Sequence, residues 1–246
     1  MRYLILSDIH ANWEALQAVL AHAHTRYDYI VCCGDVVGYG ADPDPVTEWV
    51  RANVASIVRG NHDKACAGLE DLEWFNTIAR TSAMWTMQIM KADNIGYLHD
   101  LARGPAHVDG FQIVHGSPLD EDEYVVSDQD VAQVAPYLDS SVTFFGHTHL
   151  QCAFLCHRNG IKRLATVGAE SDVEVLDLEG GVSYLINPGS VGQPRNGDPR
   201  AAYAIYQPET RLVTLCRVKY DVASAQRKIL NAGLPELLAL RLEAGI

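Results

Sequence analysis

Five apolar segments of this sequence are each followed by residues whose side chains can bind metals or move protons. The segment at 141–145, SVTFF, leads directly into Gly146-His147-Thr148-His149. In an open α/β sheet the carboxyl ends of parallel strands meet at one edge, and ligands bind there. The pattern therefore predicts an α/β sheet whose strands deliver one shared site. The residues concerned are Asp8 and His10, Asp35, Asn61 and His62, His115, and His147 and His149.

Each of these residues has an ordinary structural explanation when it is taken alone. Asp8 is a suitable cap for the next helix, Asn61 is a suitable turn residue, and His115 is a suitable buried histidine. Together, however, these explanations require five independent coincidences at one edge of a sheet. A common functional site is the simpler hypothesis.

The order of predicted elements indicates two packed sheets. Strands and helices alternate in the first half of the chain, and β-like segments dominate the second half. Two β-sheets flanked by helices fit this order. The predicted strands are 2–6, 28–33, 55–59, 111–116, 141–145, 151–157, 162–167, 183–189, 201–207 and 211–218. The predicted helices are 12–24, 42–53, 71–93, 127–138, 222–230 and 235–244.

The chain shows no linker, internal repeat or low-complexity tract. Its 246 residues are therefore expected to form a single domain, 1–246. The acidic stretch at 170–179 is expected to be a solvated surface hairpin, because exposure is the ordinary state of charged side chains.

Composition and charge exclude several classes of protein. The hydrophobic content of 48% and charged content of 20% are typical of a soluble globular protein. No apolar run approaches the ~20 residues of a membrane helix, and the first ten residues contain too short an apolar run for a secretory leader. A cytoplasmic location is expected, with the six cysteines as reduced, mostly buried thiols. The net charge of −12 and the absence of a basic cluster argue against non-specific nucleic-acid binding.

The residue types in the shared site favour transition-metal ions. They offer carboxylate and amide oxygen and imidazole nitrogen, without thiolate, which suits Mn, Fe, Zn, Ni or Co. Seven candidate ligands exceed the three or four protein ligands of a single such site. Two divalent cations sharing a bridging carboxylate would use them all. The candidates are Asp8, His10, Asp35, Asn61, His115, His147 and His149.

In order and spacing, the blocks Asp8-x-His10, Gly34-Asp35, Gly60-Asn61-His62-Asp63, His115 and Gly146-His147-x-His149 resemble the signature of the calcineurin-like metallophosphoesterases. The segment NPGSVGQPRNGDPRAAY at 187–203 is similar to a loop and strand of the small bacterial and archaeal phosphodiesterases in that superfamily. The resemblance implies a four-layer α/β/β/α sandwich with two mixed sheets. It also implies that Asp8, His10 and His149 hold one metal, that Asn61, His115 and His147 hold the other, and that Asp35 bridges them. His62 would face the substrate.

The second block departs from the protein-phosphatase branch of the family. Where that branch has an Asp that orients the catalytic His and an Arg that binds phosphate, this chain has Gly38 and Tyr39. Phosphoprotein substrates are therefore not expected. Asp63, next to His62, becomes the candidate partner that orients the imidazole, although a neighbouring Asp often points elsewhere.

The function expected from these observations is hydrolysis of phosphodiesters, nucleotides among them. A water bridging two cations would lose a proton near neutral pH, and the resulting hydroxide would attack phosphorus in line. His62, supported by Asp63, would donate a proton to the leaving oxygen or stabilise its charge. Asn12 at a helix N-terminus, Tyr39 and Arg195 are candidate substrate contacts. Structural capping, core packing and a surface position are the respective alternatives for these three residues.

Three rival functions remain open from the sequence. They are a dinucleoside polyphosphate hydrolase, a phosphomonoesterase, and a metal-dependent scaffold without catalytic activity. The presence of His62 with a full set of candidate ligands argues against the scaffold, since the retromer subunit of this fold has lost that histidine.

Overall fold

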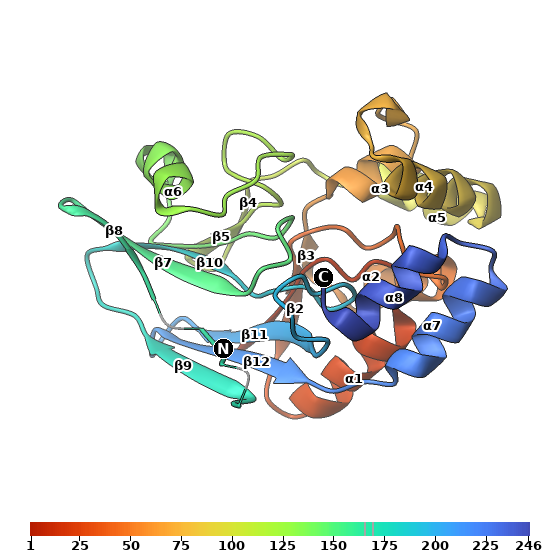
Figure 1. Ribbon diagram of the computed structural model, residues 1–246. Helices are drawn as coiled ribbons and strands as arrows, with labels where there is room; N and C mark the ends of the chain where they lie inside the picture. The colour runs from red at the N-terminus through yellow and green to blue at the C-terminus, as the bar shows by residue number, and fades with distance from the viewer. Residues whose placement is uncertain (165, 169) are drawn as a thin grey trace.

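The computed structural model describes residues 1–164, 166–168 and 170–246, and within them the strands form two six-stranded sheets (Figure 1). The first sheet contains, in spatial order, β3 (Ser56–Ile57), β2 (Tyr29–Cys32), β1 (Tyr3–Leu6), β11 (Ala201–Gln207), β12 (Leu212–Val218) and β9 (Val173–Asp177). The second contains β4 (Ala106–Val108), β5 (Phe111–Ile113), β6 (Val142–Phe144), β10 (Ser183–Asn187), β7 (Cys152–His157) and β8 (Gly160–Arg163).

Helices cover the outer faces of the sheets (Figure 1). The helices are α1 (Trp13–Ala23), α2 (Pro43–Asn53), α3 (Asn61–Cys66), α4 (Thr77–Ile89), α5 (Ala92–His99), α6 (Asp128–Val134), α7 (Val222–Asn231) and α8 (Glu236–Ala244), with short 3₁₀ turns at Leu72–Trp74 (η1) and Ala135–Tyr137 (η2). Successive side chains of a strand point to opposite faces. Leu4 of β1 therefore packs in the cluster that includes Leu16 of α1, whereas Ile5 packs with Phe111 between the sheets. Val131 of α6 covers the far face of the second sheet. The predicted α/β/β/α sandwich of two mixed sheets is confirmed.

Parallel pairing brings the predicted site residues to one edge. Strands β1, β2 and β3 run parallel, and so do β5, β6 and β10. Their carboxyl ends therefore lie on the same side of the sandwich, as the sequence predicted. This edge carries the loops that follow β1, β2, β3, β5 and β6.

Three predicted segments differ in the structure. The helix expected over 71–93 is divided, because the side chain of Asn76 accepts hydrogen bonds from the amides of Ile78 and Ala79 and so begins a new helix, α4, at Thr77. The expected hairpin at 170–179 is wrong: β9 pairs antiparallel with β12 at the edge of the first sheet, while the next strand, β10, lies in the second sheet. Of the strand expected at 162–167, β8 ends at Arg163, and Ala165 lies outside the described residues.

The cysteines are free thiols, and five of the six are buried; Cys156 is partly exposed. Among the described residues, no helix has both the length and the apolar character needed to cross a membrane.

Candidate metal centre

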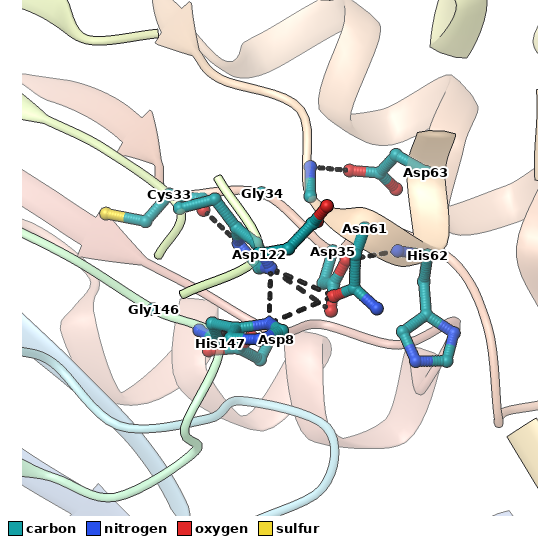
Figure 2. Close-up of polar contacts among 12 residues, drawn as sticks. Asp8, Cys33, Gly34, Asp35, Asn61, His62, Asp63, Asp122, Gly146 and His147 are labelled. Atoms are coloured by element: carbon teal, nitrogen blue, oxygen red, sulfur yellow. Dashed lines mark hydrogen bonds and ion pairs between the residues drawn. The ribbon is translucent and has the colours of Figure 1, made fainter. Parts of the chain in front are cut away.

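The seven side chains predicted as metal ligands converge at the shared strand edge. Figure 2 shows Asp8, Asp35, Asn61 and His147 among them. Each of the seven lies within five residues of the end of a strand, so short loops place all of them. Six of the seven are at most 4% exposed, and Asn61 at the start of α3 is partly buried. Burying this many carboxylates and imidazoles is unfavourable unless they are paired or hold a metal.

The side chains form two groups that share Asp35. Asp8, His10, Asp35 and His149 offer ligand atoms within 4.8 Å of one another, and so do Asp35, His115 and His147. The Oδ2 atom of Asp35 lies 3.5 Å from Nε2 of His10 and 3.5 Å from Nε2 of His115, and it accepts no hydrogen bond from the described residues. One carboxylate oxygen thus faces both groups.

Backbone carbonyls fix the tautomers of three histidines. Nδ1 of His10 lies 3.0 Å from the Val37 carbonyl oxygen, and Nδ1 of His149 lies 2.6 Å from that of Gln193. Nδ1 of His115 is likewise 2.8 Å from the Cys33 carbonyl oxygen. Each Nδ1–H donates to its carbonyl, which leaves the Nε2 lone pair directed into the site, as a metal ligand requires.

The inward atoms are too close to one another without a positive charge between them. Nε2 of His10 and Nε2 of His149 are 3.1 Å apart. In the second group, Oδ1 of Asn61 lies 3.2 Å from Nε2 of His115. Lone pairs at these distances repel each other, and a cation in each group would remove the repulsion. The residues present therefore fit metal ions.

The protonation of these groups supports the same conclusion. Burial lowers the pKa of His10, His147 and His149 well below the usual value, so their rings are neutral and able to bind a metal. Burial also raises the pKa of Asp8 to about 7 and that of Asp35 well above its usual range. Two buried carboxyl groups with raised pKa values lack a compensating positive charge, which cations would supply.

Glycines allow the strand ends to approach this closely. A Cβ at Gly60 would lie 2.0 Å from Oδ1 of Asp35, and a Cβ at Gly146 would lie 3.0 Å from Oδ2 of Asp8. The glycine that precedes Asn61 and the one that precedes His147 are thus needed for packing. Several site residues also adopt the left-handed backbone conformation, which is uncommon outside glycine and is concentrated at functional sites. They are Asp8, His10, Asp35, Tyr39, His147 and His149.

His62 lies beside the two groups, held by aromatic rings. Its ring is 4.3 Å from that of Tyr39 and 5.2 Å, edge to face, from that of Phe75. A Cβ at Gly38 would lie 2.4 Å from Nδ1 of His62. Glycine at the position where phosphatases carry Asp therefore lets the imidazole pack directly against the backbone.

Asp63 has other partners than the one expected from the sequence. Its Oδ1 accepts hydrogen bonds from the amides of Val36 and Val37, at 2.8 and 3.2 Å, and its Oδ2 accepts one from the amide of Gly60, at 3.0 Å. The carboxylate and the His62 ring point away from each other (Figure 2). The structure therefore assigns Asp63 to fixing the loop that carries Asp35, rather than to orienting His62.

Asn12 is likewise engaged in structure. Its Oδ1 accepts a hydrogen bond from the amide of Ala15 and caps α1, as its helix-start position predicted. Its Nδ2 donates to the carbonyl of Gly192 at 2.9 Å and to the hydroxyl of Tyr220 at 3.3 Å. Because both the oxygen and the nitrogen of its side-chain amide are hydrogen-bonded within the protein, Asn12 stabilises the helix and the neighbouring loop and is not free to bind a substrate anion.

Tyr39 and Arg195 do reach the site. They line a cavity of about 440 Å³ that also contains His62 and members of both ligand groups. The guanidinium of Arg195 lies over the ring of Tyr39, 5.9 Å from its centroid, and donates to the Tyr39 hydroxyl at 3.3 Å. The sequence analysis missed the outer lining of this cavity, which no motif marks. Those residues are Glu70, Trp74, Phe75, Asn76, Ala79, Asp122 and Tyr124.

The fold is a four-layer sandwich whose strand edge carries buried Asp and His side chains able to hold metal ions. The family model described as the calcineurin-like phosphoesterase superfamily domain matches residues 1–211. The chain belongs to this superfamily, which confirms the resemblance inferred from the sequence and supports a phosphoric ester hydrolase.

Similar proteins align with nearly the full length of this chain. An uncharacterized protein of Methanocaldococcus jannaschii is 36% identical over 248 residues, covering 98% of this chain and 97% of its own. The crystal structure of a metallophosphoesterase from Sphaerobacter thermophilus is 41% identical, with a TM-score of 0.85 over 100% of this chain and 99% of that one. A hypothetical protein from Pyrococcus horikoshii, 18% identical with a TM-score of 0.78, covers 100% of this chain and 98% of its own and shares the fold.

Proposed function

We propose that this protein is a phosphodiesterase that uses two divalent metal ions. The observation that carries the proposal is the sharing of Asp35 Oδ2 between two groups of inward-facing ligand atoms, at 3.5 Å from His10 and from His115. Asp8, His10 and His149 would hold one ion and Asn61, His115 and His147 the other. The nitrogen and oxygen donors suit Mn, Fe, Zn, Ni or Co, and we take Mn²⁺ as the first ion to test.

Two bound cations would supply an acidic water and a positive field for the phosphate oxygens. The reaction forms a bond from the water oxygen to phosphorus and breaks the bond from phosphorus to the leaving oxygen, which gains one of the two protons of the attacking water. Burial, together with the positive charge of Arg195, lowers the pKa of His62 to about 3. The neutral imidazole can donate its N–H to the leaving oxygen and so stabilise the charge that develops there.

The charge of the cavity favours diesters over more highly charged esters. Among the described residues that line it, Arg195 is the single Lys or Arg, while Glu70 and Asp122 add negative charge on the outer side. A phosphodiester carries one negative charge, whereas a monoester approaches two near neutral pH and a polyphosphate carries more. The observed charges therefore support a diester substrate over a phosphomonoester or a dinucleoside polyphosphate. We place the enzyme in the cytoplasm, since its six free thiols suit a reducing compartment.

A comparison of two chromogenic esters tests the proposed reaction. Metal-stripped protein is reconstituted separately with Mn, Fe, Zn, Ni and Mg and assayed with bis-p-nitrophenyl phosphate and with p-nitrophenyl phosphate. We expect a higher kcat/KM for the diester, and no turnover before metal is added. A higher kcat/KM for the monoester, or metal-independent hydrolysis, would contradict the proposal.

Substitution of Arg195 tests the proposed phosphate contact. Arg195→Ala is expected to lower kcat/KM for bis-p-nitrophenyl phosphate by about 10- to 100-fold, because a hydrogen bond to a charged group contributes roughly 1.5–3 kcal/mol. Arg195→Lys should recover part of the loss, since it keeps the charge without the planar guanidinium. An unchanged kcat/KM in Arg195→Ala would dismiss the contact.

A further inference from the structure

The outer half of the cavity is lined by aromatic side chains that the proposed reaction does not use. We define this aromatic rim as Trp74, Phe75 and Tyr124. Trp74 ends the 3₁₀ turn η1, Phe75 follows it, and Tyr124 lies between β5 and α6, so two distant parts of the chain supply the rings. The Trp74 side chain is 87% exposed and Tyr124 is 54% exposed. Rings left this open beside a functional cavity are available to a ligand.

The aromatic rim is continuous with the candidate metal centre. The ring of Tyr124 lies 4.0 Å from that of His147, one of the proposed ligands. The ring of Phe75 lies 5.2 Å, edge to face, from that of His62. A group attached to a phosphate held at the centre would therefore extend into the aromatic rim.

The charges around the aromatic rim exclude a second phosphate. Asp122 lies 2.5 Å from Nζ of Lys64, and Glu70 lies 3.2 Å from the same atom. Lys64 is also 3.4 Å from Glu121, which accepts two hydrogen bonds from the guanidinium of Arg59 at 2.9 Å, so two cations face three carboxylates. The outer cavity is thus acidic and aromatic, whereas Arg195 and the proposed cations concentrate positive charge at the inner end.

We propose that the aromatic rim binds a planar ring carried by the substrate, so that the substrates are singly charged phosphodiesters with an aromatic group, most naturally a nucleobase. This inference rests on the proposed function for the position of the phosphate. Stacking between a base and an aromatic side chain contributes enough binding free energy to select such a group. It tolerates different rings because every base has a π-face. The cavity volume of about 440 Å³ lies within the range of small-ligand sites.

Calorimetric binding of product-like phosphates tests this inference without turnover. Mn²⁺-supplemented wild-type protein is titrated with adenosine 5′-monophosphate, phenyl phosphate and ribose 5-phosphate. We expect the two ring-bearing ligands to bind roughly ten-fold or more tightly than ribose 5-phosphate. Tighter binding of the adenosine compound than of phenyl phosphate identifies a nucleobase as the group selected, and equal binding identifies any aryl group.

Variants of the exposed rings complete the test. Trp74→Ala should reduce the preference for ring-bearing ligands and leave ribose 5-phosphate affinity unchanged, because Trp74 is 87% exposed and its loss should not unfold the chain. Tyr124→Ala should also reduce that preference. Tyr137→Ala, which removes an aromatic side chain 56% exposed outside the cavity, is the matched control. Equal affinity of wild type for all three ligands, or an unaltered preference in both variants, would overturn the inference.

The result is separable from the proposed function. If the protein hydrolyses diesters but shows no preference for ring-bearing ligands, only the proposed binding of a planar ring at the aromatic rim is refuted. A protein that prefers rings but hydrolyses none of the esters would refute the phosphodiesterase proposal alone.

Discussion

Asp35→Ala is expected to lose bound metal and activity together. The substitution removes the one carboxylate oxygen that faces both ligand groups, 3.5 Å from His10 and from His115. Metal ions contribute several kcal/mol to such reactions, so turnover of bis-p-nitrophenyl phosphate should fall by about 10³-fold or more. Metal content measured by mass spectrometry on the purified variant, beside its kcat, checks the prediction.

A second variant separates metal loss from loss of folding. Oδ1 of Asp35 accepts a hydrogen bond from the His62 amide at 2.9 Å, and Asp35→Asn can keep that bond while it removes the charge. It should therefore fold like wild type by circular dichroism and still bind fewer cations. Asp139→Ala, which alters an exposed carboxylate, is the control that should retain both. Two cations still bound to folded Asp35→Ala would rule out the bridging role.

His62→Ala should retain its metals and lose most of its activity. The imidazole lines the cavity beside both ligand groups and belongs to neither of them. Acid–base and hydrogen-bonding groups typically contribute 10²–10⁴-fold, so kcat for a diester should fall by roughly that factor. Steady-state kinetics with metal analysis of the same preparation provide the measurement.

The choice of substrate makes the His62 test sharper. The loss should be larger for a diester with an alkyl leaving group than for one with p-nitrophenolate, because the more basic leaving oxygen depends more on stabilisation of the charge that develops on it. His99→Ala, at an exposed histidine, serves as the control for loss of an imidazole. Near-normal turnover of both substrates by His62→Ala would eliminate this residue from the reaction.

The sequence predicted the residues at the strand edge well because short local patterns in the chain determine where each strand ends. An apolar run followed by Gly and then Asp, Asn or His indicates a buried strand that ends in a tight turn. The side chain after the turn is one that can bind a metal. The glycines before Asn61 and His147 are there because a Cβ would collide with Asp35 or approach Asp8. Parallel pairing then brings these strand ends together, so most of the candidate centre could be inferred without coordinates.

The features that the sequence did not reveal depend on tertiary contacts. Asp63 follows His62 directly, yet its carboxylate turns to three backbone amides because these donors are buried and need acceptors. The Trp74 and Tyr124 rings come from separate loops, and no spacing predicts that they share a cavity. The edge strand β9 was missed because its charged, exposed residues resemble a surface turn, and only pairing with β12 defines it.

Titration of metal-free wild-type protein with Mn²⁺ tests the central claim most directly. Calorimetry should show two ions bound per chain, and diester hydrolysis should reach its full rate only when the second ion is bound. Saturation at one ion per chain with full activity, or no specific binding at all, would contradict the account.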